Sequence, residues 1–406
     1  MKKNNKRVCV VRHSYYPECT RMFKEVNALT GAGYEVDLIC LNSPNKPADW
    51  VQIGGLRIYR LPHSHRRGSK ARYAIVFSRS ILQMGLLLCA LWFRRRYACI
   101  QVNTLPDALV FITWLPRLFG TRILLDLHEP TPELLLSKYN GQVSKSFLKL
   151  QMLVEQQAIR YAHRVITVND TIRQRFIERG ADPDKISVVR NVPPEDFDAQ
   201  EPPHRPHDGL VLMTHGTLQP RYGHDLLLRT LPLLRGRFND IRLIVAGLGE
   251  TRKELERLAA QLKCDDIVTF TGGVPRNDIA RLIVNADIGI VPLLPGPFSE
   301  LCQPNKLFEY MAFRVPVIAA RMPAIEESFD DSCIQYFKAG DAEDLVKTIT
   351  ALAENPQRRE LLAAAAFARY QTLCWRGAKK EYIRIIDDLI KSGRPRRTPE
   401  RSRHED

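Results

Sequence analysis

Short apolar runs alternate with helix-like stretches along the chain. In the first half, these runs are rich in valine, isoleucine and leucine: RVCVV (7–11), VDLICL (36–41), ACIQV (98–102), RILLD (122–126) and RVITV (164–168). Runs of this kind are typical of strands buried on both faces of a parallel sheet. The alternation therefore predicts an α/β fold, in which helices cover a parallel sheet.

A second series of runs follows a segment that has no apolar periodicity. This segment, PPEDFDAQEPPHRPHDG (193–209), is rich in proline and charge, as linkers are. The runs after it are LVLMTH (210–215), IRLIVAG (241–247), IVTFTGG (267–273), ADIGIV (286–291) and VPVIAA (315–320). Since 406 residues suffice for two domains, we expect a first domain at 1–194, a linker at 195–208, a second domain at 209–374 and a disordered basic tail at 392–406.

The formal net charge of +15 indicates an anionic partner: a phosphorylated substrate, an acidic membrane surface or nucleic acid. No nucleic-acid recognition motif accompanies the charge, so we do not predict nucleic-acid binding. The nine cysteines form no C-x-x-C pair and no zinc-spaced cluster, which indicates reduced thiols. The N-terminal MKKNNKRVCVVRHS passes directly into a strand pattern and has no signal-peptide core. These features predict a cytoplasmic protein.

The segment 66–97 combines an apolar run with basic flanks. It opens with RRGSKAR, continues through ILQMGLLLCALWF (81–93) and closes with RRRY. The apolar run is shorter than the roughly 20 residues of a membrane span, so a transmembrane helix is disfavoured. Two interpretations remain: a core helix of the first domain, or a core helix that also rests on an anionic leaflet. The second would place the protein peripherally on the inner face of the cytoplasmic membrane.

The stretch PNKLFEYMAFRVPVIAA (304–320) joins a turn, a short helix and a buried strand. Its helix carries Lys306 and Glu309 among apolar residues, and proline is well suited to the start of a helix. An amine and a carboxylate beside a core strand are typical of a ligand site on an α/β sheet.

Other polar residues follow predicted strands, where open parallel sheets bind their ligands. In the first half these are Asp107, His128 and Glu129. In the second half a loop with Arg221 leads from HGT (215–217) to a helix start near His224. A helix N-terminus with a nearby arginine predicts an anion site that could take a diphosphate.

These segments resemble the retaining glycosyltransferases of family 4, which have the GT-B fold, and in particular a subgroup that makes bacterial surface polysaccharides. The segments that carry the resemblance are PNKLFEYMAFRVPVIAA (304–320), HRVITVN (163–169) with ISVVRNV (186–192), NTLPD (103–107) and DLHEPTPE (126–133). The resemblance implies two Rossmann-like domains that face a central cleft, and a C-terminal helix at about 375–391 that crosses back to the first domain. It also implies a nucleotide-sugar donor and a glycan or polyprenyl-linked acceptor.

The resemblance assigns residues to the donor site. Glu309 would bind the ribose hydroxyls, and Lys306 would either bind the phosphates or pair with Glu309. The donor-binding set is Gly216, Thr217, Arg221, Gly272, Val274, Asn305, Lys306, Leu307 and Glu309. The catalytic candidates are His128, Arg221 and Lys306, with His128 either near the donor sugar or capping a strand end.

Candidates for the acceptor side of the cleft are His13, Asp107 and Glu129, with Arg12 and Tyr15 as weaker ones. The chain also departs from the family pattern. Thr217 and Tyr222 stand where the family usually has arginine and lysine, and we expect Arg221 to supply the missing charge. Leu301 stands at the position of the first of two motif glutamates, with Glu300 beside it as a substitute through a shifted loop.

The implied reaction retains the configuration at the anomeric carbon by front-face attack, with the donor phosphate helping to deprotonate the acceptor. No D-x-D pair follows a predicted strand, so a metal-dependent GT-A mechanism is disfavoured and no metal or cofactor is expected. The alternatives are a non-catalytic GT-B subunit of a polysaccharide synthesis complex, and a GT-B epimerase or phosphorylase. A phosphorylase would need a much longer chain with a lysine for pyridoxal phosphate.

Overall fold

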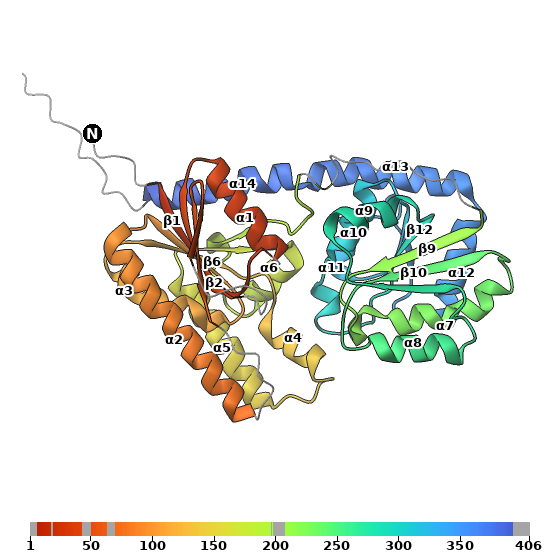
Figure 1. Ribbon diagram of the computed structural model, residues 1–406, viewed down its shortest axis with the longest axis horizontal. Coiled ribbons are helices and arrows are strands. Elements are labelled where there is room, and N and C mark those ends of the chain that lie inside the picture. Colours follow the sequence, from red (N-terminus) through yellow and green to blue (C-terminus); the bar gives the residue numbers. More distant parts are fainter. Residues whose placement is uncertain are drawn as a thin grey trace, which may run out of the picture.

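The computed structural model describes residues 6–17, 19–42, 50–62, 70–195, 197 and 208–392, with the backbone alone for 70–74 and 276–277. Most of the expected linker and the tail from 393 onward lie outside the described residues. Two α/β domains stand next to each other, each built on a mainly parallel sheet (Figure 1). The predicted fold class is confirmed.

The first domain is built on an eight-stranded sheet. Its described strands are parallel except for the antiparallel edge pair β3–β4, which the apolar pattern had not predicted. In spatial order they are β3 (Trp50–Ile53), β4 (Leu56–Leu61), β2 (Glu35–Leu41), β1 (Arg7–Tyr15), β5 (Cys99–Asn103), β6 (Arg122–Asp126), β7 (Arg164–Thr167) and β8 (Ile186–Val188).

Helices cover both faces of this sheet, as parallel sheets require. They are α1 (Thr20–Gly31), α2 (Lys70–Arg95), the 3₁₀ helix η1 (Asp107–Thr113), α3 (Trp114–Leu118), α4 (Thr131–Lys138), α5 (Lys145–Tyr161), α6 (Asp170–Glu178) and the 3₁₀ helix η2 (Pro183–Lys185). Alternate residues of β1 enter different cores: Val8 and Val10 pack in the core that includes α1, whereas Cys9 and Val11 pack in the core that includes α2 and α5.

The second domain has a six-stranded parallel sheet. In spatial order its strands are β11 (Val268–Gly272), β10 (Ile241–Ala246), β9 (Leu210–His215), β12 (Ile288–Val291), β13 (Val317–Ala320) and β14 (Gln335–Phe337). Its helices are the 3₁₀ helix η3 (Pro220–Tyr222), α7 (His224–Arg235), α8 (Arg252–Gln261), α9 (Arg276–Val284), the 3₁₀ helix η4 (Ser299–Leu301), α10 (Asn305–Ala312), α11 (Pro323–Glu326), α12 (Ala342–Ala353) and α13 (Pro356–Leu373).

The last helix, α14 (Trp375–Ser392), leaves the second domain and packs on α1, β5 and β6 of the first. Figure 1 shows α13 and α14, in blue, running along both domains. The Tyr382 hydroxyl donates to Gln101 Oε1 at 2.6 Å, and Arg122 Nη2 donates to the Ser392 carbonyl at 2.6 Å. Residues more than 250 positions apart in the chain therefore share one interface.

Candidate active site

A cavity of about 650 Å³ lies between the two domains. Several of its lining residues follow strands of both sheets by one or two positions: His128 after β6, Val168 after β7, Gly216 after β9, Gly247 after β10 and Gly273 after β11. The cavity thus lies at the carboxyl ends of both sheets, the edge at which α/β sheets bind ligands.

Lys306 is a buried cation in the wall of this cavity. Only 5% of it is exposed, its Nζ lies 3.3 Å from Thr214 Oγ1, and it stands 5.4 Å from the centroid of the Tyr222 ring. Burial lowers the pKa of Lys306 to about 8, although Cys302 and Glu309 act in the opposite direction. A buried ammonium with one hydroxyl contact at the start of α10 is well placed to meet an anion.

Glu309 lines the same cavity, one helical turn after Lys306. Its Oε2 lies 3.4 Å from His215 Nε2. Burial, with the charge of Lys306, lowers the pKa of His215 to about 3, so the imidazole is neutral and the contact is not an ion pair. Asn305, at the first position of α10, also lines the cavity, and its Oδ1 is buried without a hydrogen-bond partner in the described structure.

The loop from 216 to 223 approaches neighbouring backbone so closely that it needs glycine. Gly223 has φ +64°, and a Cβ there would lie 1.8 Å from the Pro292 carbonyl oxygen.

Arg221 in this loop does not line the cavity itself: its guanidinium lies 5.1 Å from the centroids of both the Tyr222 and Phe298 rings. Its charge nevertheless opposes the rise that burial causes in the pKa of Glu129, across the cleft.

The first domain contributes His128 and Glu129, which follow β6 and line the cavity. His128 Nε2 lies 2.9 Å from Arg12 Nη2. Burial lowers the pKa of His128 to about 3, and Arg12 adds to this shift. His128 is therefore a neutral imidazole.

Two family descriptions match this chain. Residues 20–192 match the model described as "Glycosyl transferase 4-like domain", and residues 209–355 match the one described as "Glycosyl transferases group 1". The chain belongs to the family-4 glycosyltransferases.

Known proteins of this group are distant relatives. The chain is 29% identical over 252 residues to a D-inositol 3-phosphate glycosyltransferase of Thermomonospora curvata, across 56% of this chain and 57% of that protein. It is 28% identical over 252 residues to a D-inositol 3-phosphate glycosyltransferase of Frankia alni, across 58% of this chain and 61% of that protein. The chain thus spans less than two thirds of the length of these curated relatives.

Solved structures share the fold along nearly the whole chain. Sucrose-phosphate synthase from Thermosynechococcus elongatus has a TM-score of 0.75 at 18% identity, over 95% of this chain and 99% of that one. The Anabaena protein HepE in complex with UDP-glucose has a TM-score of 0.67 at 15% identity, over 94% of this chain and 99% of that one. These likenesses establish the GT-B fold.

In this member of the family, the predicted donor residues are not all in the cavity. Gly216, Thr217 and Val274 line it, as do Asn305, Lys306 and Glu309. Gly272 lies one residue before the lining residue Gly273. Leu307 is fully buried in the second domain's core, so its side chain makes no donor contact. Helix α10 turns this residue away from the face that carries Lys306 and Glu309.

Two of the three residues predicted for the acceptor side lie elsewhere. Asp107 is 3% exposed and accepts from Thr131 Oγ1 at 2.9 Å, and burial raises its pKa to about 7. The His13 ring packs against Phe77 with centroids 4.8 Å apart, and its Nε2 lies 3.1 Å from Ser80 Oγ. Neither lines the cavity, so these two predictions are corrected, whereas Glu129 does line it.

Leu301, at the position of the first family glutamate, connects the domains. It is 2% exposed, packs in the core of the first domain, and accepts from Asn169 Nδ2 at 2.9 Å through its carbonyl. Glu300 is exposed and does not line the cavity, so it does not replace the missing carboxylate. An apolar interdomain contact has taken this place.

Several cavity residues of this family member were not predicted from the sequence. His215 and Gly247 lie at strand ends, so the rule that selected His128 could also have selected them. Cys302 lines the cavity next to Leu301, and burial raises the pKa of its thiol to about 12. No pattern in the sequence marks it.

Proposed function

We propose that this chain transfers a sugar from a nucleoside diphosphate sugar to an acceptor hydroxyl, with retention at the anomeric carbon. One observation carries the proposal: a buried cation, Lys306, and the carboxylate of Glu309 lie on one face of α10 and both line the interdomain cavity. The fold relatives solved with UDP and with UDP-glucose support a nucleotide-sugar donor.

The leaving diphosphate gains negative charge as the glycosidic bond breaks. Lys306 and the uncapped N-terminus of α10 supply positive potential at one side of the cavity, and Arg221 adds a fixed charge from the loop 216–223. Preorganised charges of this kind are usually the largest contribution to catalysis. Since these groups can neutralise the diphosphate, we propose that the transfer needs no metal ion. Glu309 would accept hydrogen bonds from the ribose.

The test is a thermal-shift screen of the protein against UDP, GDP, ADP and dTDP. A ligand that binds only the folded state at 100 times its Kd stabilises it by about 2.7 kcal/mol. We expect one nucleotide to raise the melting temperature of the wild type and of the control Glu300→Ala, whose side chain is exposed outside the cavity. Glu309→Ala should lose most of the shift.

The opposite outcome would favour the alternative function. If no nucleotide stabilises the folded wild type, the chain is better explained as a non-catalytic GT-B subunit. If Glu300→Ala and Glu309→Ala lose the shift equally, the donor site has been misplaced.

We further propose that the acceptor is linked to a lipid and that the protein docks peripherally on the inner face of the cytoplasmic membrane. The support is an apolar face on the first domain, formed by α2, by η1 with α3, and by α5. The 3₁₀ helix η1 packs against both α2 and α5. The large exposed side chains of this apolar face are Ile75, Leu82, Leu86, Phe93, Phe111, Trp114, Leu118, Phe119, Phe147, Leu150 and Leu153.

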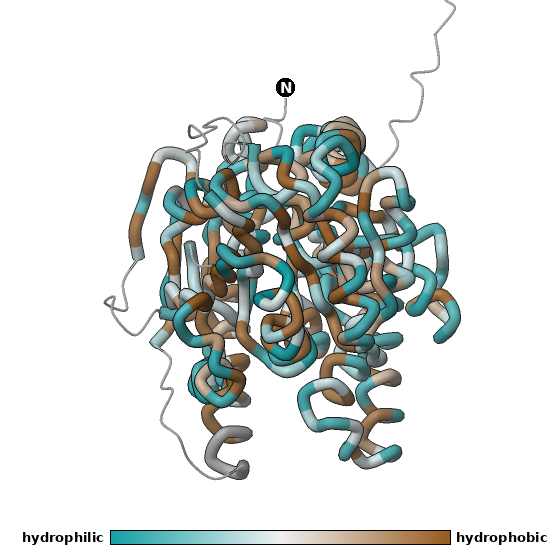
Figure 2. Tube along the Cα trace, turned by 90° about the vertical axis from the view of Figure 1, so that its right-hand side faces the viewer, coloured by the Kyte–Doolittle hydropathy of each residue, from teal (hydrophilic) through white to brown (hydrophobic). Residues whose placement is uncertain are grey.

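Several leucines of this apolar face are largely exposed. Leu82 is 62% exposed, Leu86 64% and Leu118 73%, and extended apolar patches on soluble proteins usually mark interaction sites. In Figure 2, helices at the lower end of the molecule carry brown, hydrophobic stretches.

The charge around the apolar face is of one sign. The stretches 70–106, 108–125 and 134–154 contain no aspartate or glutamate. Arg79, Arg94, Arg117, Lys145 and Lys149 are exposed there. Basic residues near an anionic leaflet contribute about 1 kcal/mol each, and exposed leucines add the free energy of leaving water. Apolar side chains ringed by cations match the headgroup region of an anionic membrane.

In this proposal the helix α2 lies on the membrane surface and does not cross the membrane. From Ile75 to Arg95 it is long and apolar enough to cross one by length and composition alone, and 28% of its most apolar window is buried in the protein. Met84, Leu88 and Trp92 pack in the core of the first domain. One side of α2 therefore belongs to the core, and the other side is available to a membrane surface.

A further inference from the structure

We propose that Arg12 is a positioning residue that holds His128 as a neutral imidazole protonated at Nδ1, so that the histidine beside Asp126 is not a proton acceptor. The proposal goes beyond the donor and acceptor assignments, and Arg12 was predicted only as a weak acceptor contact. It concerns the wall of the same cavity.

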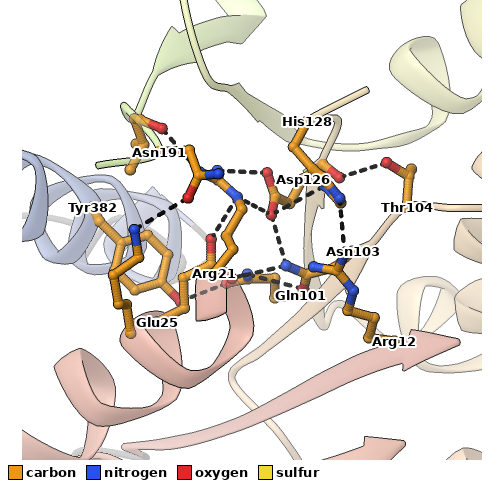
Figure 3. A network of polar contacts seen from close by, with 12 residues as sticks. Arg12, Arg21, Glu25, Gln101, Asn103, Thr104, Asp126, His128, Asn191 and Tyr382 are labelled. Atoms are coloured by element: carbon orange, nitrogen blue, oxygen red, sulfur yellow. Dashed lines mark hydrogen bonds and ion pairs between the residues drawn. The ribbon is translucent and has the colours of Figure 1, made fainter. Parts of the chain in front are cut away.

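The contact between Arg12 and His128 determines which ring nitrogen carries the proton. Arg12 Nη2 lies 2.9 Å from His128 Nε2 (Figure 3). A guanidinium has only donors and keeps its proton in proteins, so Nε2 must be the acceptor. A neutral imidazole that accepts at Nε2 carries its proton at Nδ1. The position that could take a proton from a substrate is therefore already occupied.

The carboxylate of Asp126, two residues before His128, does not form a hydrogen-bonded pair with the histidine ring. A histidine and an aspartate act together as a base when the carboxylate accepts from the ring N–H. Here His128 Nδ1 is 3.8 Å from Asp126 Oδ2, which is too long for a hydrogen bond. Arg21 holds the carboxylate instead, with Nε and Nη2 each 2.7 Å from one of its oxygens. Asn103 Nδ2 adds a bond of 2.6 Å to Oδ2.

Further hydrogen bonds hold the residues that bind Asp126 in place. Glu25 Oε2 accepts from both Asn103 and Gln101 at 2.8 Å, and Gln101 accepts from Tyr382 on the returning helix α14. Figure 3 shows this network reaching from α14 to His128. The charge of Asp126 is thus fixed away from the ring by groups on three other elements: α1, β5 and α14.

The electrostatic environment of His128 also favours the neutral imidazole. Burial is the largest cause that lowers its pKa, and the cations Arg12 on β1 and Arg21 on α1 lower it further. Asp126 on β6 is the group that raises it. Removal of Arg12 would both free Nε2 and take away one of these charges, so Asp126 would gain influence over the ring.

The test is ¹⁵N NMR of the full-length protein labelled at histidine, with His128→Asn used to assign the signals. We expect the wild-type His128 to show the Nδ1–H tautomer and no titration between pH 5 and 8. Arg12→Met leaves Nε2 without its donor and removes one of the charges that lower the pKa of His128. Its ¹⁵N signals should therefore show either a mixture of the two neutral tautomers or a titration that the wild type lacks. Arg12→Lys keeps a cationic donor, and its His128 should stay neutral across the window.

The proposal would be overturned if the wild-type His128 titrated between pH 5 and 8 or carried its proton at Nε2. It would also be overturned if the ¹⁵N signals of His128 were the same in Arg12→Met as in the wild type. Should Arg12→Met fail to fold, the wild type and Arg12→Lys still decide the question. The readout needs no turnover, so it stands even if the nucleotide screen finds no ligand. That screen, applied to Arg12→Met, also reports whether its donor site is intact.

Discussion

At the scale of single residues, the helical period of α10 separates ligand contacts from core packing. Lys306 and Glu309 are three positions apart and reach the cavity from one face. Leu307 lies between them in sequence but packs in the core. Because the amine is forced into a buried position, its protonation becomes sensitive to what the cavity contains.

We predict opposite pH dependences for stability and for nucleotide binding, both caused by Lys306. Burial lowers its pKa from the usual 10.5 to about 8. Between these values the unfolded chain holds more protons than the folded one, so the free energy of unfolding of the empty protein rises with pH in this window. Nucleotide affinity should fall as pH rises above about 8, because the diphosphate then meets an uncharged amine.

The measurement is urea unfolding and calorimetric UDP titration from pH 7 to 10, for the wild type and for Lys306→Met. Other groups that titrate in this range contribute equally to both proteins, so the difference between them isolates Lys306. Equal pH profiles for the two proteins would contradict the prediction.

At the scale of elements, α2 has two faces with different partners. Ser80, Met84 and Leu88 are buried against the first domain, whereas Leu82 and Leu86 are exposed. The spacing of the buried residues is that of one helix face. An apolar residue on the opposite face gains nothing for folding, which favours a role in binding.

We predict that Leu82→Glu with Leu86→Glu weakens binding to vesicles that contain phosphatidylglycerol. Full burial of a leucine contributes about 1.5–3 kcal/mol, so partial insertion of two corresponds to a loss of about 10–100-fold. The measurement is vesicle co-sedimentation at low salt, with neutral phosphatidylcholine vesicles for comparison.

The matched control is Leu233→Glu with Leu361→Glu. These leucines are 64% and 66% exposed but lie on α7 and α13 of the second domain. The control should bind like the wild type. Loss of binding in both double variants, or no binding by the wild type, would remove the membrane proposal.

At the scale of the whole molecule, Glu327 holds the two domains together. From the second domain it accepts from the backbone N–H groups of Asp170 at 3.2 Å and Thr171 at 2.6 Å, at the start of α6 in the first. Arg190 Nη1 adds a bond of 3.1 Å to the same carboxylate. A carboxylate at a helix N-terminus satisfies donors that would otherwise lack partners.

We predict that Glu327→Ala lowers the free energy of unfolding by about 1–2 kcal/mol, the usual effect of losing a helix cap, and loosens the domain arrangement. The measurements are thermal unfolding and the radius of gyration from small-angle X-ray scattering. The control is Glu326→Ala, because Glu326 pairs with Arg321 at 2.7 Å within the second domain. A radius of gyration that is unchanged in Glu327→Ala would refute the interdomain role.

The sequence by itself determined the elements and the family. The apolar runs predicted both parallel sheets because strands buried on both faces have a local signature. The stretch from Pro304 to Ala320 predicted Lys306 and Glu309 as a ligand pair, and both line the cavity. Weak or short strands left no such signature: β3 is largely exposed, and β14 has only three residues.

Only the tertiary structure decided which residues reach the cavity. Asp107, His128 and Glu129 were all expected at strand ends of one sheet, yet only His128 and Glu129 line the cavity. The path of each loop and the helix it meets decide this, and neither is local. Arg12 meets His128 across 116 positions and Leu301 meets Asn169 across 132. Periodicity in a sequence reports burial along one element, whereas a site depends on which elements pack together.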